Sequence, residues 1–273
     1  MAARGEDEHA AAGRLNTPAM RAPADLGGAY SPPSWLIGHR GVRAIRLENS
    51  LDAFRWAVDH RVRVIEMDLR LTADNVLVCS HDPTLLRLFG RDRRVGGTTA
   101  AELSAIDPHT PSAVPRAEDA LDAIEHRARV VLEMKPDSSG SIPETLLALL
   151  ERRRAAGRQD DILCISSFDH AAVRELLDLD PSRLEQLALL VSYRESLTSA
   201  LSAAARLSIS WVHPHYTGLL REPWGARLAR RRGITLATYT VNSPRLVLLM
   251  RTLGAEYVFT DDPYLLDPRR ATS

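Results

Sequence analysis

The chain has 273 residues, which suits one large α/β domain with a sizeable apolar core, because barrels of this class routinely run past about 200 residues. Its 35 basic and 35 acidic side chains balance, so no overall field draws it to nucleic acid or to an anionic membrane. The longest apolar runs have the length of strands, so we expect no stable membrane anchor.

The first 33 residues are rich in Ala, Gly, Pro and charge and show no sustained period, which is typical of a flexible leader. Glu6, Asp7 and Glu8 stand where a signal peptide would need an apolar stretch. These features predict a cytoplasmic protein with a leader over 1–33, a barrel domain over 34–268 and a short tail over 269–273.

From Trp35 onward, short apolar runs rich in β-branched residues alternate with longer amphipathic stretches. The predicted strands are 35–38, 62–68, 129–134, 162–166, 187–191, 209–212, 234–240 and 256–259. The predicted helices are 49–60, 117–127, 142–156, 169–179, 195–206, 219–232 and 243–253. Asn49, Asp169 and the Ser243-Pro244 pair are the expected helix starts.

Regular alternation of strands and helices predicts a parallel sheet covered by helices. Eight such repeats favour closure into a (β/α)8 TIM-type barrel over an open, doubly wound sheet. No GxGxxG follows any predicted strand, which further disfavours a dinucleotide-binding fold.

One strand-like run, VLVCSH over 76–81, follows the second strand too closely for a parallel crossover. We therefore expect residues 69–81 to form an antiparallel β-ribbon that extends the second strand, with the turn at TADN. A two-residue loop there would place Glu66 opposite His81 and Asp68 opposite Cys79.

Charged side chains and a histidine gather where the first three barrel strands end, and the ribbon delivers a further histidine and carboxylate. They are His39, Arg40, Glu66, Asp68, Glu133 and Lys135, with His81 and Asp82 from the ribbon. In a barrel these ends line one mouth, where active sites are built. Burying several carboxylates there requires counter-charge, and oxygen donors without thiolates suit one hard divalent cation, Mg²⁺ or Ca²⁺.

Each of these residues also has a structural interpretation. A Glu-x-Asp pair on a strand is often solvated, and Glu133 with Lys135 could be an ion pair and no more. The coincidence at successive strand ends favours a functional site over these separate explanations.

Two segments resemble the glycerophosphodiester phosphodiesterase family. GHRGVRAIRLENSLDAFRWAV is similar to the family's HRG, P-E-N-T and A-F helix, and IEMDLRLTADNVLVCSHDPTLLR to its IExDVxxTxDGxxVVxHDxxLxR. LEMKP, ISSFD, YTVN and GAEYVFTDDP resemble later family blocks, so the likeness runs from about residue 36 to residue 263. There are departures: Leu47 replaces proline, Ser50 threonine, Asn75 the turn glycine and Tyr239 tryptophan.

The resemblance implies a phosphoric diester hydrolase that converts small-molecule glycerophosphodiesters to an alcohol and glycerol phosphate. It implies that His39 and His81 act as general acid and base, without assigning which is which. The implied metal ligands are Glu66, Asp68 and Glu133. The implied phosphate contacts are Arg40 and Lys135, and the implied substrate-lining residues are Glu48, Phe168 and Tyr239. Attack by the substrate's own glycerol hydroxyl and direct attack by water both remain open.

Other patterns have a structural interpretation that we favour. His213-Pro214-His215 resembles a zinc ligand pair, but such a pair needs further ligands. Cys79 and Cys164 sit in apolar strands and are expected to be core residues. Two rival functions remain open, a lysophospholipase D acting on larger lipids and a non-catalytic phosphodiester-binding barrel, and the sequence does not determine the oligomeric state.

Overall fold

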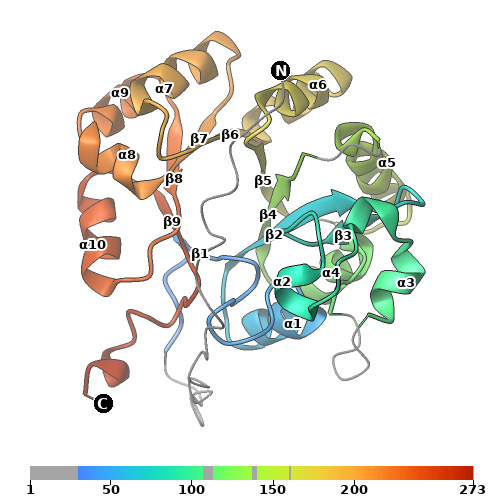
Figure 1. Ribbon diagram of the computed structural model, residues 1–273. Coiled ribbons are helices and arrows are strands. Elements are labelled where there is room, and N and C mark those ends of the chain that lie inside the picture. The colour runs from blue at the N-terminus through green and yellow to red at the C-terminus, as the bar shows by residue number, and fades with distance from the viewer. Residues whose placement is uncertain (1–29, 107–112, 137–139, 160, 273) are drawn as a thin grey trace.

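The computed structural model describes residues 30–106, 113–136, 140–159 and 161–272 (Figure 1). Most of the predicted leader, residues 1–29, lies outside this range, so its flexibility stays a prediction. Tyr30 packs against Tyr264 with ring centroids 5.7 Å apart. No helix among the described residues is long and apolar enough to cross a bilayer.

Eight parallel strands close into a barrel, as predicted, and a ninth pairs antiparallel on its flank. The barrel order is β1-β9-β8-β7-β6-β5-β4-β2, and the pairing of β1 with β2 closes the ring. The strands are β1 Leu36–Gly38, β2 Val64–Leu71, β3 Leu77–Cys79, β4 Arg129–Met134, β5 Ile162–Ser167, β6 Leu187–Val191, β7 Trp211–Pro214, β8 Thr235–Thr238 and β9 Tyr257–Thr260.

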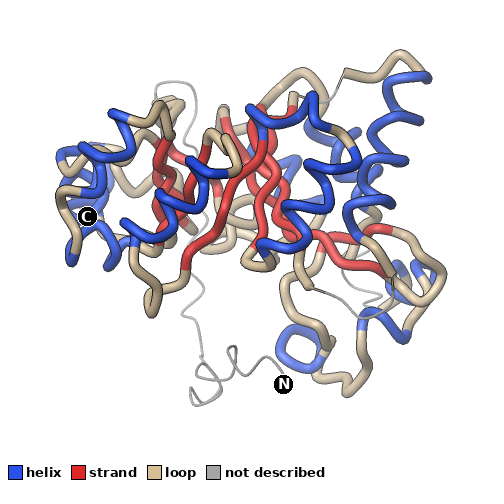
Figure 2. The backbone as a smooth tube through the Cα atoms, turned by 90° about the horizontal axis from the view of Figure 1, so that it is seen from above, coloured by secondary structure: helices blue, strands red, loops and turns tan. Residues whose placement is uncertain are grey.

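Helices lie outside the strands, as Figure 2 shows. They are α1 Leu51–Asp59, α2 Leu86–Phe89, α3 Ala100–Ser104, α4 Ala117–Ile124, α5 Ile142–Ala155, α6 His170–Leu179, α7 Leu197–Arg206, α8 Tyr216–Arg221, α9 Gly225–Arg231 and α10 Pro244–Thr252, with 3-10 turns η1 Val95–Gly97, η2 Pro181–Gln186 and η3 Pro268–Thr272.

Each of the seven predicted helices is present, but the structure adds the short helices α2 and α3, and the predictions were wrong in two further details. The single helix expected over 219–232 is two helices, because Pro223 lies between α8 and α9 and cannot continue a helical ladder. Asn49 does not cap α1: the cap is Ser50, whose side chain accepts from the Ala53 amide at 3.1 Å. Asp169 and Pro244 do begin their helices as expected.

The apolar core has two layers because residues alternate along each strand. Side chains such as Ile65, Met67 and Leu132 point outward and pack under the helices. The barrel interior is filled by an inner set: Ile37, Val64, Val131, Leu163, Cys164, Ala188, Trp211, Ala237 and Phe259. Both cysteines are buried and free, as predicted. Because apolar side chains fill the barrel interior, the polar side chains lie at the ends of the strands.

The ribbon forms as predicted, but its predicted register is wrong by one residue. Leu69 lies opposite Cys79, so the expected pairs of Glu66 with His81 and Asp68 with Cys79 do not occur. Cys79 therefore shares a face with Met67, whose sulfur is 3.8 Å from its own.

The turn explains the difference. The loop holds three residues, 73–75, and Thr72 donates its backbone N–H to the Val76 carbonyl at 3.0 Å. A two-residue loop would require left-handed backbone at Ala73 and Asp74, which both disfavour. Asn75 instead adopts a φ of 55° and supplies the single left-handed residue that a three-residue loop requires.

This turn gives a stability prediction. Replacing the exposed Asn75 by valine should lower the free energy of unfolding by about 1–2 kcal/mol, because a β-branched residue strains the left-handed conformation. Thermal unfolding should show a lower midpoint for Asn75→Val and a nearly unchanged one for Asn75→Gly. Equal midpoints for the valine variant and the parent would contradict the assigned loop.

Candidate active site

Strand register brings the predicted residues together at one mouth of the barrel. Asp68 on β2 lies directly opposite Glu133 on β4. Gly38, the last residue of β1, pairs with Ile65 on one side and with Thr260 of β9 on the other. The residues that follow these pairs therefore converge, and they include His39 and Asp261.

Glu66, Asp68 and Glu133 form a buried acidic cluster. One carboxylate oxygen from each lies within 4.8 Å of the other two, and among the described residues this is the one group of His, Cys, Asp and Glu with such spacing. Glu66 Oε1 is buried and has no partner among the described residues, while the buried oxygens Asp68 Oδ1 and Glu133 Oε1 have Lys135 as their ion-pair partner. Three carboxylates this close together fit a hard divalent cation such as Mg²⁺ or Ca²⁺.

Two buried cations partly neutralise this cluster. Lys135 Nζ is 3.2 Å from Asp68 Oδ1 and also pairs with Glu133. Arg40 Nε is 3.2 Å from Asp68 Oδ2. Both cations are almost completely buried, at 4% and 7% exposed. With all five groups ionised, the three carboxylates and two cations have a net charge of −1. A bound divalent ion would make this net charge positive.

Burial affects the three carboxyls differently. Burial raises the pKa of Glu66 well above its usual range, and the charges of Asp68 and Glu133 add to the effect. Burial likewise raises the pKa of Glu133, against the attraction of Lys135. At Asp68 the attraction of Lys135 and Arg40 outweighs burial and holds the pKa well below its usual value. The charged form of Asp68 is therefore favoured, and both buried cations pair with it.

Two left-handed residues hold the carboxylates in place. Arg40 has a φ of 51° and donates its backbone N–H to Glu66 Oε2 at 2.7 Å. Asn49 has a φ of 56°, donates its side-chain amide to Asp68 Oδ2 at 2.7 Å and accepts the Asp68 amide at 3.1 Å. Asn49, expected from sequence as a helix start, is instead a support of the acidic cluster, and its backbone strain belongs to the site.

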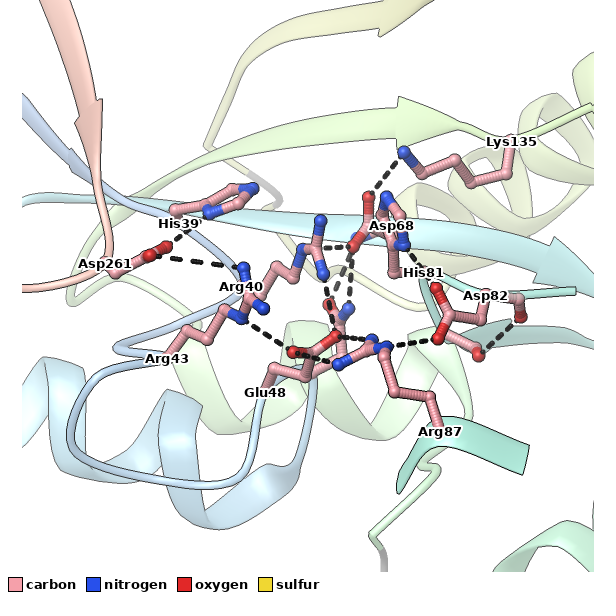
Figure 3. Close-up of polar contacts among 12 residues, drawn as sticks. His39, Arg40, Arg43, Glu48, Asp68, His81, Asp82, Arg87, Lys135 and Asp261 are labelled. Atoms are coloured by element: carbon pink, nitrogen blue, oxygen red, sulfur yellow. Dashed lines mark hydrogen bonds and ion pairs between the residues drawn. The ribbon is translucent and has the colours of Figure 1, made fainter. Parts of the chain in front are cut away.

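Each candidate histidine is held by a carboxylate (Figure 3). His39 Nδ1 is 2.6 Å from Asp261 Oδ1, and His81 Nδ1 is 2.7 Å from Asp82 Oδ1. A carboxylate only accepts, so Nδ1 must carry the proton in each ring, which leaves Nε2 with its lone pair. Burial lowers the pKa of His39 and lowers that of His81 to about 4, which favours the neutral form of each ring.

His81 reaches the mouth although β3 ends two residues earlier. The Ser80 amide bonds to the Asp68 carbonyl at 3.0 Å, which is the last rung of the ribbon. Arg70, which points inward from β2, donates Nε to the His81 carbonyl at 2.9 Å. Figure 3 shows the His81 ring beside Asp68.

The predicted substrate-lining residues occupy two places. Phe168 is 37% exposed, its ring lies 5.8 Å from Lys135 Nζ, and its centroid is 5.8 Å from that of Tyr239. The Tyr239 hydroxyl is bonded to the Val191 carbonyl at 2.8 Å. Glu48 lies apart from these aromatic residues and is 4% exposed.

Glu48 is surrounded by Arg40, Arg43 and Arg87, at 2.7, 2.8 and 2.5 Å. Burial opposes its ionisation, but these arginines outweigh burial and lower its pKa to about 2. Arg43, Arg87, Asp261 and Asn242 were not predicted as site residues. Asp261 and Arg87 lie within segments that carried the family resemblance, so the motifs contained the signal that strand-end reasoning missed.

The His213-Pro214-His215 segment forms no metal site with this cluster. His213 is fully buried, and its Nε2 is 3.6 Å from Cys164 Sγ. His215 caps α8 and accepts from the Thr217 amide at 3.3 Å. The two rings serve packing and capping, which agrees with the structural interpretation.

The low pKa of Glu48 predicts how stability depends on pH. The contribution of its ion pairs is complete above the ordinary pKa of 4.5 and is lost as the pH falls through about 2. Glu48→Gln should therefore be less stable than the parent at pH 6, and this difference in unfolding free energy should shrink between about pH 4.5 and 2. Urea unfolding across this range measures it; a constant difference would contradict the assigned ion pairs.

Comparison with known proteins agrees with this site. The model of the Glycerophosphoryl diester phosphodiesterase family matches residues 39–265. A glycerophosphodiester phosphodiesterase of Bacillus subtilis is 26% identical over 89% of this chain and 88% of its own length. A probable glycerophosphodiester phosphodiesterase 1 of Mycobacterium tuberculosis is 28% identical over 84% of this chain and 89% of its own.

Solved structures share the fold. The glycerophosphodiester phosphodiesterase of Thermotoga maritima matches with a TM-score of 0.69 at 26% identity, covering 87% of this chain and 97% of the other. An Oleispira antarctica phosphodiesterase, solved in complex with the product sn-glycerol-3-phosphate, has a TM-score of 0.71 at 23% identity over 84% and 93% of the two chains. With the family match spanning most of the barrel, the chain belongs to the glycerophosphoryl diester phosphodiesterase family and is a phosphoric diester hydrolase.

Proposed function

We propose that this chain hydrolyses glycerophosphodiesters to an alcohol and glycerol phosphate, using one divalent cation and two histidines. The observation that carries the proposal is the pairing of two carboxylate-held histidines with a buried cluster of three carboxylates at one barrel mouth. The family to which the chain belongs supports the substrate class.

Glu66, Asp68 and Glu133 would hold the cation, Mg²⁺ or Ca²⁺, as oxygen donors. When bound, such an ion polarises a phosphoryl oxygen and offsets the charge that develops on it. Arg40 and Lys135 already border the cluster, so their charges are placed to attract the phosphodiester anion. Lys135 Nζ lies 5.8 Å from the Phe168 ring, which supports Phe168 as a substrate-lining residue beside the phosphate.

His39 and His81 would move the protons. The ring that acts as base is neutral with Nδ1–H bonded to its aspartate, so its Nε2 can accept the proton of the attacking hydroxyl, and the aspartate stabilises the resulting imidazolium. The ring that acts as acid must be in the imidazolium form, with a second proton taken up at Nε2 from solvent, and it delivers that proton to the leaving alcohol oxygen. This pair serves attack by the glycerol hydroxyl followed by hydrolysis of a cyclic phosphate, with the roles exchanged in the second step, and it serves direct attack by water.

A lysophospholipase D activity is a second candidate that one observation favours. Phe168 and Tyr193 are 37% and 47% exposed, and the rings of His215 and Tyr239 connect them at centroid distances between 5.6 and 6.0 Å. A continuous aromatic surface beside the candidate phosphate site suits an apolar or cationic leaving group.

The small-molecule substrate and the cytoplasmic location remain predictions.

Cation dependence gives the first functional prediction. Exhaustive chelation should abolish turnover of glycerophosphocholine, and Mg²⁺ or Ca²⁺ should restore it. Glu66→Gln should weaken cation binding measured by calorimetry and lower turnover in parallel. Full turnover after chelation, or in Glu66→Gln, would show that the cluster is structural.

The two histidines give the second functional prediction. His39→Gln and His81→Gln should each lower kcat by about 10²–10⁴, because each removes one proton-transfer partner. Cation affinity should stay near that of the parent. Turnover close to the parent level in both variants would show that neither histidine is catalytic, whereas the absence of turnover in the parent would favour the non-catalytic barrel.

A panel of substrates separates the two candidate activities. Glycerophosphocholine, glycerophosphoethanolamine and lysophosphatidylcholine, assayed with each cation, should give the highest kcat/KM for a glycerophosphodiester. A higher kcat/KM for the lysophospholipid would favour the lipid-directed reaction.

A further inference from the structure

A chain of ion pairs joins the two candidate catalytic histidines (Figure 3). From His81 it runs to Asp82, whose second oxygen, Oδ2, accepts Arg87 Nε at 2.5 Å. The same guanidinium donates Nη2 to Glu48 Oε1 at 2.5 Å and Nη1 to Oε2 at 3.1 Å. Arg87 thus bridges two carboxylates, one of which is bonded to a histidine.

The other arm of the chain starts from Glu48. Glu48 Oε2 is 2.8 Å from Arg43 Nε, and Arg43 Nη1 is 4.0 Å from Asp261 Oδ2. Asp261 in turn bonds His39. The amide of Asn242 also donates to Asp261 Oδ2, at 2.7 Å. Glu48 is therefore the common point of two arms that end on the two imidazoles.

Both oxygens of Glu48 are occupied by arginines. Oε1 accepts hydrogen bonds from Arg40 Nη1 and Arg87 Nη2, Oε2 accepts one from Arg87 Nη1, and Arg43 Nε forms an ion pair with Oε2 at 2.8 Å. A carboxylate offers about four acceptor sites, so three are hydrogen-bonded and an ion-pair partner lies beside Oε2. The side chain is also buried. A substrate hydroxyl could bind Glu48 only by displacing an arginine.

We propose that Glu48 is a positioning residue that orients both His39 and His81, through Arg43–Asp261 and Arg87–Asp82, and that it does not contact the substrate. The proposal rests on the proposed function in that it takes both histidines as catalytic. An aspartate holds the Nδ1–H of its histidine at one angle only if its other carboxylate oxygen is also held. Arg87 holds that oxygen in Asp82, and Asn242 holds it in Asp261 with Arg43 at 4.0 Å.

The two arms differ in strength. Arg87 approaches Asp82 closely with Nε, whereas Arg43 stands 4.0 Å from Asp261, which Asn242 holds as well. Loss of Arg87 should therefore disturb His81 more than loss of Arg43 disturbs His39. Arg87 and Arg43 have 41% and 39% of their side-chain surface exposed, so methionine can replace either without opening a buried cavity.

The experiment compares Arg87→Met and Arg43→Met with a matched control, Arg93→Met. Arg93 lies in the same segment after the ribbon, is 46% exposed and pairs with Glu102 away from the site. Nitrogen-15 NMR of histidine-labelled protein reports which ring nitrogen carries the proton, and variants lacking His39 or His81 assign the signals. Turnover of glycerophosphocholine gives kcat and KM separately.

In Arg87→Met, we expect the His81 signals to change from a fixed Nδ1–H form to a mixture of tautomers, with kcat lowered about 10–100-fold and KM nearly unchanged. Arg43→Met should alter His39 in the same direction but less, and Arg93→Met should change neither ring. Glu48→Gln should alter both rings, and adding Arg87→Met to it should then have little further effect on His81.

Unchanged histidine signals in Arg87→Met would overturn the proposal. So would a Glu48→Gln protein whose KM rises while both rings keep their parent signals, since that pattern belongs to a substrate contact. The tautomer measurement needs no turnover. If His39→Gln and His81→Gln remained active, the proposed function would fail, while the NMR signals would still decide whether the ion-pair chain orients the rings.

Discussion

The burial of three carboxylates at the mouth of the barrel is the constraint on which the rest of the site depends. Placing Glu66, Asp68 and Glu133 there would be prohibitive without counter-charge, because desolvating unpaired ions costs several kcal/mol each. Lys135 and Arg40 provide it, and both direct their charge at Asp68. Glu66 keeps one buried oxygen without a partner among the described residues, and the three carboxylates lie close enough together to bind a cation.

Several local features become intelligible from this constraint. Arg40 and Asn49 adopt left-handed backbone conformations, which cost free energy in non-glycine residues, and each uses that conformation to bond a cluster carboxylate. The ribbon keeps Arg70 inside the mouth, where its guanidinium holds the backbone of His81. Most of the buried charged side chains lie at the mouth, while the inner and outer layers of the core are apolar.

The surroundings of the histidines suggest why the site uses so many arginines. Imidazoles that transfer protons to or from a phosphodiester need a fixed tautomer, and Asp82 and Asp261 set it. Asp82 bonds Arg87, Asp261 lies 4.0 Å from Arg43, and both arginines also pair with Glu48. The structure alternates negative and positive groups from one ring to the other, which keeps the net charge of the arc small.

Local sequence determined much of this protein. Apolar runs separated by amphipathic stretches specified the eight barrel strands, and polar residues at the ends of those strands identified His39, Arg40, the three carboxylates and Lys135, because strand ends share one mouth in any closed parallel barrel. Tertiary structure decided the rest. His39 meets Asp261 across 222 residues because β1 pairs with β9, the ribbon register follows from the left-handed Asn75, and Glu48 joins three arginines that strand periodicity cannot relate. Periodicity reports which face a side chain takes; only the packed chain fixes which charges become neighbours.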